Sequence, residues 1–256
     1  MLKPNFVIHS EDEIRAIRKA AHAAATVREK LIQLVRPGMT TKNLDDLAGS
    51  LIASTGGTSA FLGYRGFPGQ ICISLNEEVV HGIGSNQRIL NEGDLVSLDI
   101  GVKLDGGVGD TAKSFCLGRA PASDESILLE NTELALMEGI KEAKAGNYVG
   151  DISAAVEKVA KKAGLGVVRE YVGHGCGTLL HEPPEVPNFV TRNRGPRLIP
   201  GMVLAIEPMF NLGTHKVITA SDRWTVSTLD GKLSAHFEHM VYITQHEPEI
   251  LTWLKM

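Results

Sequence analysis

Four acidic residues and one histidine lie in apolar, strand-like segments or Gly-rich turns, where a solvated charge is not expected. They are Asp99, Asp110, His174, Glu207 and Glu238, at intervals of 11, 64, 33 and 31 residues. The segments around them read VSLDIGV, GVGDTAKSF, YVGHGCG, VLAIEPMF and AHFEHMVYI. A carboxylate in an apolar strand is costly to bury unless it is paired or bound to a metal. Together the five residues predict a shared cation site.

Each of the five also has a plainer interpretation when taken alone. Asp99 would cap a turn, Asp110 would be an ordinary aspartate of a Gly-rich turn, and His174 would be a satisfied structural histidine. Glu207 and Glu238 would form buried salt bridges. Lys and Arg are sparse around both glutamates, and three glycines leave the imidazole of His174 accessible. The shared metal site is therefore the favoured interpretation.

The donor set indicates which metals would bind. Four oxygen donors and one nitrogen donor suit Mn²⁺, Fe²⁺ or Co²⁺, are compatible with Zn²⁺, and disfavour a sulfur-ligated structural zinc site. Four carboxylates carry more negative charge than one divalent ion balances. Two ions about 3.5–4 Å apart, sharing bridging carboxylates, match that charge and activate water for hydrolysis. We expect two divalent metal ions.

Helices and short strands must position these residues. Ser10 and Glu13 have the spacing of a capping box, which predicts the start of the first helix. The periodicity predicts helices over 10–36, from Thr41 or Asn43 to about 55, over 123–145 and over about 150–164. It predicts strands near 71–75, 94–103, 111–117, 166–172, 202–210, 223–229 and 232–244.

A weak internal repeat appears at a fixed offset of 108 residues. Gly38–Leu44 matches Gly146–Ile152, and Gly93–Asp99 matches Gly201–Glu207. The plain alternative is that two helix–turn patterns align by chance. The favoured interpretation is a duplicated helix–helix–sheet half. The halves would pack their strands into one sheet with helices outside and place the site between them, in a single domain over 1–256.

Composition excludes several classes of protein. The 256 residues are 43% hydrophobic and 22% charged with a net charge of −4, which gives no basic surface for nucleic acid. The three cysteines are Cys72, Cys116 and Cys176, an odd number that argues against a disulfide framework and for a reducing compartment. No secretory signal or membrane span of about 20 apolar residues is seen. We expect a cytoplasmic protein without membrane or direct nucleic-acid partners.

The chain resembles the type I methionine aminopeptidases. The resemblance rests on GYRGFPGQICISLNEEVVHGI, LDIGV with GVGDTAKSF, GHGCG with LHEPP, AIEPM and SAHFEH, in order across residues 10–245. It implies the α+β pita-bread fold of creatinases and aminopeptidases, with pseudo-twofold halves of about 10–120 and 121–250 around a central antiparallel sheet. It also implies removal of the N-terminal methionine from nascent proteins and peptides that have a small second residue.

The resemblance implies a role for each ligand. Asp99 would chelate one metal ion, His174 and Glu207 the other, and Asp110 and Glu238 would bridge both. A metal-bridging hydroxide would attack the first peptide bond, with Glu207 as the proton shuttle. The free α-amine of the substrate would bind the ion that Asp99 chelates, which accounts for the choice of chain ends.

The resemblance assigns further residues to the substrate. His81 would help to donate a proton toward the leaving amine, and His181 would hydrogen-bond the scissile carbonyl and stabilise its developing charge. The side chain of methionine would meet aromatic rings and a sulfur atom, which suit a thioether. This pocket comprises Tyr64, Phe67, Cys72 and Trp224, with Leu180 at its edge. Plain core packing is the alternative for Tyr64 and Phe67.

Two positions depart from the pattern of the family. Leu180 stands where members often have Phe, and it would widen the pocket and relax side-chain discrimination. Cys176 stands where an aliphatic residue is common. It is either a site of sensitivity to thiol reagents or a small buried filler, and the second interpretation is favoured.

Three alternatives fit the sequence less well. Prolidases and proline aminopeptidases share the ligands but usually carry a large N-terminal domain, whereas this chain begins at its first helix. A type II enzyme needs an insertion of some 60 residues between the last two glutamates, which are only 31 apart. A catalytically inactive relative that serves as a binding module on nucleic acid or the ribosome would be expected to have lost metal ligands. All five ligand candidates are present here. The expected partner is the N-terminal methionine of nascent chains; the family implies a transient ribosome contact, and nothing requires more than a monomer.

Overall fold

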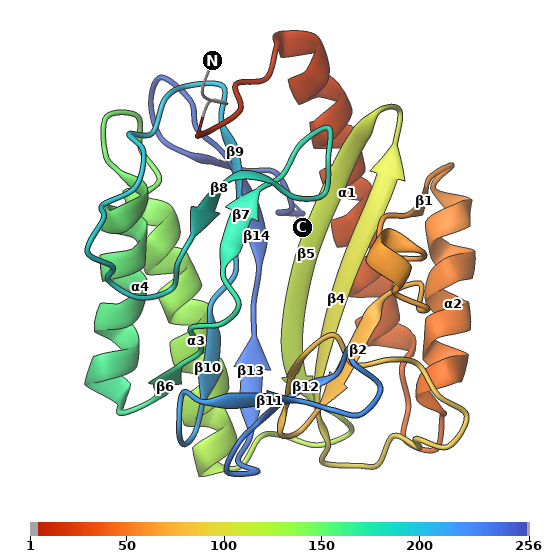
Figure 1. Ribbon diagram of the computed structural model, residues 1–256. Coiled ribbons are helices and arrows are strands. Elements are labelled where there is room, and N and C mark those ends of the chain that lie inside the picture. Colours follow the sequence, from red (N-terminus) through yellow and green to blue (C-terminus); the bar gives the residue numbers. More distant parts are fainter. Residues whose placement is uncertain (1–4, 255–256) are drawn as a thin grey trace.

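The computed structural model describes residues 5–254. Its helices are α1 (Glu11–Leu34), α2 (Thr41–Ser54), α3 (Ser123–Glu142) and α4 (Val149–Ala163), with a short 3-10 turn η1 (Tyr64–Gly66). The helices α1 and α2 lie beside one part of a strand layer, and α3 and α4 lie beside the other (Figure 1). Within residues 5–254, none of the helices has the length and apolarity needed to span a bilayer.

Capping residues set where the helices start. The Glu13 amide donates to Ser10 Oγ, and the Ser10 amide donates to Glu13 Oε2 at 2.7 Å, so the predicted capping box of α1 is present. The helix α2 begins at Thr41, one of its two predicted starts. Its cap is Thr40, which exchanges two bonds of 3.1 Å with Asn43. Extended backbone at the cap lets its side chain satisfy a free helix amide.

The strands are antiparallel throughout the described pairings. They are β1 (Thr58–Ser59), β2 (Cys72–Leu75), β3 (Glu78–Val80), β4 (Leu95–Leu104), β5 (Gly107–Cys116), β6 (Gly166–Val167), β7 (Gly173–Gly175), β8 (Glu182–Val186), β9 (Val203–Ile206), β10 (Met209–Asn211), β11 (Val217–Thr219), β12 (Val226–Thr228), β13 (Ser234–His236), β14 (His239–Tyr242) and β15 (Glu249–Ile250). The ladder orders are β1-β4-β2 with β5 on β4, β13-β10-β6, β11-β12-β3 and β15-β14-β9-β7-β8. The expected single sheet is therefore divided into four ladders.

Hydrogen bonds between β5 and the segment β13–β14 join the two parts of the strand layer. The Glu238 amide donates to the Ala112 carbonyl at 3.0 Å, and Thr111 Oγ1 donates to the Glu238 carbonyl at 2.9 Å. Further along, Ser114 Oγ donates to the His236 carbonyl at 2.8 Å. These bonds define a seam between the two parts of the strand layer, where β5 lies against residues 236–238.

Several strand predictions were wrong. Asp110 lies inside β5 and not in a turn, because Gly107 and Gly109 let α1 pack directly on the strand. A Cβ atom on Gly109 would lie 2.2 Å from the Ala20 carbonyl oxygen. The predicted strands 202–210 and 232–244 are each broken into two, at 207–208 and 237–238.

The offset of 108 recurs in the observed elements. The helices α2 and α4 begin at Thr41 and Val149, and β4 and β9 begin at Leu95 and Val203. Two isolated bridges, Thr40 with Ile89 and Tyr148 with Arg197, keep the same offset at both ends. The matching pairs Gly38 and Gly146, and Gly93 and Gly201, all have φ between +89° and +99°, a left-handed conformation that favours glycine. Both repeated segments therefore adopt one local structure.

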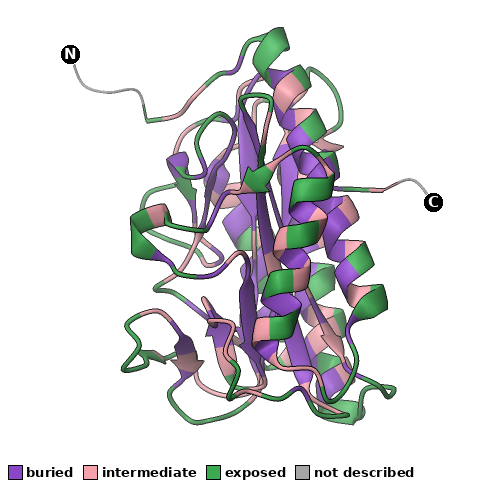
Figure 2. Cartoon of the chain, turned by 90° about the vertical axis from the view of Figure 1, so that its right-hand side faces the viewer, coloured by how far each residue is buried: buried purple, intermediate pink, exposed green. Residues whose placement is uncertain are grey.

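The apolar core follows the same division. One buried cluster, with Leu136 and Ile206, lies under α3 and α4, and another, with Leu44 and Leu98, lies under α1 and α2. A third, which includes Met240, lies between them. The strands are buried while the helices expose their outer faces (Figure 2). Burial of apolar side chains is the main force that holds such layers together.

Candidate metal centre and substrate cavity

The two aspartates lie on one face of the β4–β5 hairpin. Asp99 stands opposite Ala112, and Asp110 stands opposite Gly101. Residues two apart along a strand point to the same side, so both carboxylates face the seam. The two groups are close enough that the charge of Asp99 helps to raise the pKa of Asp110, after the larger effect of burial. An uninterrupted ladder of ten pairs fixes this placement.

The two glutamates lie at breaks between strands. Glu207 follows the last residue of β9, and Glu238 precedes the first residue of β14. The strands on either side of these breaks pair with each other, Ile206 with His239 and Met209 with His236. The two breaks are therefore neighbours, and both glutamates meet the aspartates at the seam.

His174 completes the cluster from β7. Its Nε2 atom lies 3.3 Å from Glu207 Oε1 and 3.9 Å from Asp110 Oδ2. Single ligand atoms of Asp110, His174 and Glu238 lie within 4.8 Å of one another. Nδ1 lies 2.9 Å from the Gly175 carbonyl oxygen. A proton on Nδ1, donated to that carbonyl, leaves the lone pair of Nε2 free for a metal.

Burial raises the pKa of all four carboxyl groups well above the usual range, and neighbouring carboxylates add to the effect. The groups are Asp99, Asp110, Glu207 and Glu238. Three of their buried oxygens, Asp99 Oδ1, Asp110 Oδ1 and Glu238 Oε1, have no hydrogen-bond partner within the described chain. Buried polar atoms without partners are rare in native proteins. The residues fit divalent metal, which would supply both the missing partners and the missing positive charge.

One buried cation lies near this cluster, and sequence reasoning missed it. Arg28 of α1 donates to Thr111 Oγ1 and is 6% exposed. Its charge lowers the pKa of Glu238, but this effect is smaller than that of burial. Within residues 5–254 no Lys or Arg forms an ion pair with any of the four carboxylates. Glu207 and Glu238 therefore have no Lys or Arg partner for the buried salt bridges of the alternative interpretation.

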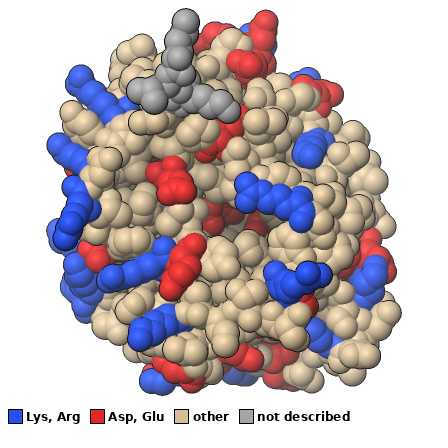
Figure 3. All heavy atoms as spheres, viewed as in Figure 1, with Lys and Arg blue, Asp and Glu red and all other residues tan. Residues whose placement is uncertain are grey.

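A cavity of about 230 Å³ opens onto the cluster. It is lined by every residue that the sequence assigned to the metal or the substrate: Tyr64, Phe67, Cys72, His81, Asp99, Asp110, His174, Leu180, His181, Glu207, Trp224 and Glu238. The space-filling view shows acidic atoms at the floor of a hollow in this face, with basic side chains around it (Figure 3). The fold thus brings residues from both halves into one small chamber.

Two histidines flank the chamber. His81 follows β3 with a left-handed φ of 61°, a strained conformation of the kind that clusters at functional sites. Burial lowers its pKa to about 4. His181 lies at the exposed mouth, where partial burial and then the nearby His174 lower its pKa to about 3. Both imidazoles are therefore neutral at pH 7, and each has one N–H to donate.

Aromatic rings form much of the wall. Tyr64 stacks on His181 with ring centres 5.3 Å apart, and Phe67 meets Trp224 edge to face at 5.2 Å. Phe67 is also part of the buried cluster at the seam, so it both packs the core and lines the cavity. Leu180 is 4% exposed and lies in the same cluster. Cys176 is fully buried, which agrees with a filler.

Sequence reasoning missed seven lining residues: Phe61, Arg65, Val80, Tyr171, Val172, Met209 and His236. His236 and Met209 each lie two residues from a metal-ligand candidate, Glu238 and Glu207, so i ± 2 spacing was an available signal. Arg65 and Val80 come from segments whose path depends on distant contacts. No local pattern identifies them.

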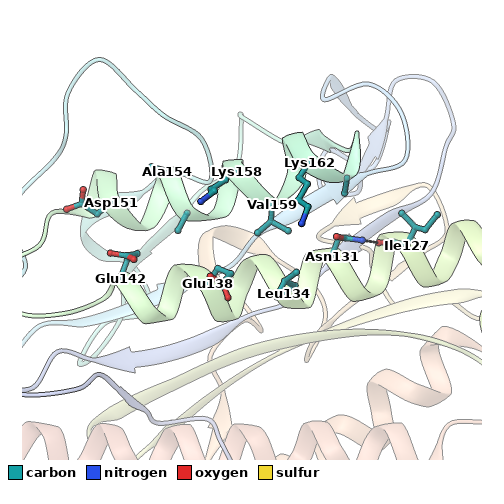
Figure 4. A pocket seen from close by; sticks show the side chains of 12 residues that line it. Ile127, Asn131, Leu134, Glu138, Glu142, Asp151, Ala154, Lys158, Val159 and Lys162 are labelled. Carbon is teal, nitrogen blue, oxygen red and sulfur yellow. Dashed lines mark hydrogen bonds between the residues drawn. The ribbon is translucent and has the colours of Figure 1, made fainter.

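A larger hollow of about 630 Å³ runs along the outer faces of α3 and α4. Acidic residues, among them Glu142 and Asp151, lie at one end, and Lys158 and Lys162 lie toward the other (Figure 4). The floor between them is apolar, with Leu134 half exposed. It has no histidine, cysteine or buried carboxylate, so it offers none of the chemistry of the seam cavity.

Comparisons with known proteins agree with this geometry. The model of metallopeptidase family M24 matches residues 15–245. Methionine aminopeptidase 1 of Bacillus subtilis is 47% identical over 240 residues, 94% of this chain and 96% of that protein. Methionine aminopeptidase of Clostridium acetobutylicum is 44% identical over 246 residues, 96% of this chain and 98% of that protein.

Solved structures give the same result. The crystal structure of methionine aminopeptidase from Thermotoga maritima matches with a TM-score of 0.94 at 37% identity, covering 97% of this chain and all of that one. Prolidase from Pyrococcus furiosus matches with a TM-score of 0.78 at 21% identity, covering 98% of this chain and 66% of that one. At that identity the likeness is one of fold alone.

Proposed function

This chain belongs to metallopeptidase family M24 and has its pita-bread fold, and from that premise we propose how the seam cavity works. The activity is hydrolysis of the peptide bond that follows an N-terminal methionine. The observation that carries the mechanism is one small cavity in which four carboxylates and four histidines meet an aromatic wall. We propose that the whole chain acts as one catalytic domain, with halves of about 10–120 and 121–250.

The cluster would hold two divalent ions, Mn²⁺, Fe²⁺, Co²⁺ or Zn²⁺. Asp99 would bind one ion, His174 and Glu207 would bind the other, and Asp110 and Glu238 would bind both. The bound ions would lower the pKa of a water molecule and so supply a nucleophile near neutral pH. The unpartnered oxygens of Asp99, Asp110 and Glu238 support this assignment.

Three side chains would handle protons and charge. Glu207 would accept a proton from the attacking water and pass it toward the leaving amine. His181, at the mouth, would donate its N–H to the scissile carbonyl oxygen as negative charge develops there. His81 would donate a hydrogen bond on the leaving-group side. Each of these neutral imidazoles acts by its N–H without adding a fixed charge.

The wall would select methionine. Tyr64, Phe67 and Trp224 present aromatic surface, and the buried Cys72 adds a soft sulfur. Such surfaces favour a flexible thioether. The small volume of the cavity supports a preference for a small second residue, since a large one must share the space. Leu180 would leave more room than a larger aromatic residue.

The same proposal extends to the substrates, the compartment and the partners of the protein in the cell. The substrates would be the N-terminal methionines of nascent chains, met in the cytoplasm by a monomer that touches the ribosome transiently. Three cysteines without a bridge, Cys72, Cys116 and Cys176, support a reducing compartment. The net charge of −4 supports the absence of a direct nucleic-acid partner.

A peptide panel tests the proposal. After loading with Mn²⁺, the protein should cleave Met-Ala-Ser readily and Met-Leu-Ser at least tenfold less efficiently in kcat/KM. Acetyl-Met-Ala-Ser, which lacks a free amine, should not be cleaved. Cleavage of Xaa-Pro peptides alone would replace this proposal with a prolidase activity. Equal cleavage of Met-Ala-Ser and Met-Leu-Ser would remove the assigned preference for a small second residue.

A further inference from the structure

His236 is a buried histidine of the cavity to which no role has yet been given. It ends β13, is 2% exposed and lines the same chamber as the metal-ligand candidates. Its Nε2 atom has no hydrogen-bond partner within the described chain. A buried ring nitrogen without a partner costs free energy, so its retention beside the cluster needs an explanation.

The backbone around His236 is held firmly. Its amide donates to Ser114 Oγ at 2.8 Å, and the same hydroxyl donates to its carbonyl at 2.8 Å. Ser97 Oγ lies 2.6 Å from Ser114 Oγ, so two strands of the first half fix this residue of the second. The backbone that carries the ring is therefore held from outside the metal cluster.

The ring faces Glu207. Nε2 lies 3.6 Å from Glu207 Oε2, while His174 Nε2 lies 3.3 Å from Oε1. Each oxygen of this carboxylate thus faces one imidazole. No hydrogen bond to either oxygen is formed within residues 5–254. When His174 Nε2 serves as a metal ligand it can no longer donate, and His236 is then the remaining facing donor.

We propose that His236 is a positioning residue for Glu207: in the working enzyme its Nε2–H donates to Glu207 Oε2 and fixes the orientation of that carboxylate. A separation of 3.6 Å is longer than a formed hydrogen bond. Catalytic hydrogen bonds are often long in unliganded sites and tighten in the working complex. The inference rests on the role proposed for Glu207.

Two substitutions of His236 distinguish the effect of its hydrogen bond from the effect of its ring shape. His236→Phe keeps an aromatic ring and removes the donor, whereas His236→Gln replaces the ring with an amide that can donate over a similar reach. Outer donors to metal ligands typically contribute about 10- to 100-fold to metal affinity or activity. His236→Phe should lower kcat about tenfold or more with little change in KM, and weaken Mn²⁺ binding. His236→Gln should restore both within about threefold.

His239→Gln is the matched control. His239 is also buried and adjacent to Glu238, but its Nδ1 lies 2.7 Å from Thr252 Oγ1 and it does not line the cavity. It should leave kcat and Mn²⁺ affinity close to wild type. Thermal unfolding of each variant shows whether it is folded at the assay temperature.

The readouts are kcat and KM on Met-Ala-Ser and the dissociation constant for Mn²⁺ by calorimetry. If His236→Phe matches wild type in kcat and Mn²⁺ affinity, or if His236→Gln is as impaired as His236→Phe, the positioning role is overturned. If the wild type cleaves no methionine peptide, the proposed function fails instead. The Mn²⁺ constants of the two variants then still decide whether His236 supports Glu207.

Discussion

The two halves of the molecule use the same scaffold to present different carboxylates. Asp99 and Glu207 occupy equivalent positions 108 residues apart, each four residues after the start of a strand, β4 or β9. In the first half the strand continues through Asp99, and Asp110 stands on the next strand of the same ladder. In the second half the strands break at Glu207 and Glu238.

This difference suits the two pairs of carboxylates to different tasks, binding metal ions in the first half and proton transfer in the second. Aspartates have short side chains and lie in a continuous hairpin, so their oxygens have little freedom. Glutamates have one more rotatable bond and lie where the ladder hydrogen bonds stop. A proton shuttle must accept and release protons, whereas a structural ligand must only hold the metal ion. We therefore expect the first half chiefly to hold the ions and the second half both to hold them and to move protons.

The largest effect should come from the hairpin. Asp110→Asn removes a proposed bridging carboxylate, so metal content and turnover on Met-Ala-Ser should both be lost. Elemental analysis and peptide assay measure the two. Asp105→Asn is the control, because it makes the same change in an exposed turn of the same hairpin. A metal-loaded, fully active Asp110→Asn protein would refute the assignment.

Glu207→Gln tests the reacting half directly. Removing a group that transfers protons typically costs about 10²- to 10⁴-fold in rate. The variant should lose turnover within that range while its content of Mn²⁺ falls less than in Asp110→Asn. Glu185→Gln, an exposed change on β8, should have no effect. If metal content and turnover fall in proportion, Glu207 is only a ligand and the two halves do not differ.

The cavity histidines should have a smaller effect than the carboxylates. Each half supplies one, His81 and His181. Replacing either by Ala should lower kcat on the order of 10²-fold, with metal content intact, because each is proposed to donate only to the substrate. His246→Ala changes an exposed histidine and serves as the control. Loss of metal in His81→Ala would move that residue into the metal cluster.

The smallest effect concerns stability without metal. Burial raises the pKa of Asp110 above its usual value of 3.8, so the folded state holds this proton more tightly than the unfolded state. A raised carboxyl pKa makes the charged group destabilising, increasingly so as pH rises from about 4 toward the folded value. Metal-free Asp110→Asn should therefore unfold at a higher temperature than metal-free wild type.

That gap should widen as pH rises above about 4. The charge of Asp110 also raises the pKa of Glu207 and Glu238, so its removal relieves their repulsion and adds to the gap in the same direction. Thermal melts in chelator measure it. A gap that is constant over this range, or a less stable variant, would show that Asp110 is not held as a costly buried charge.

Sequence patterns predicted the helices well because their signals are local. The capping box at Ser10 and the starts of α2 and α4 depend on neighbours within one turn. The 108-residue repeat was also confirmed by the structure. Its matching glycines, such as Gly38 and Gly146, both have a left-handed backbone conformation, which favours glycine in the sequence. The ligand candidates stood out because charges are rare in apolar strands.

The strands were predicted less well because their causes are distant. Gly109 looks like a turn residue, yet it is a strand residue that lets α1 approach. The strand β7 is Gly-His-Gly and β8 contains two prolines, so neither has the composition of a strand. Arg28 reaches the cluster from a helix 83 residues before its partner Thr111. Such contacts exist only after the halves pack.

Metal-dependent hydrolysis is the central claim, and one titration tests it most directly. The wild-type protein is stripped with chelator, Mn²⁺ is added back in known amounts, and Met-Ala-Ser cleavage is measured at each step together with bound metal. The stripped protein should be inactive, and activity should return as the seam cluster fills. Full activity of a verified metal-free protein, or saturated metal without any cleavage of Met-Ala-Ser, would contradict the account.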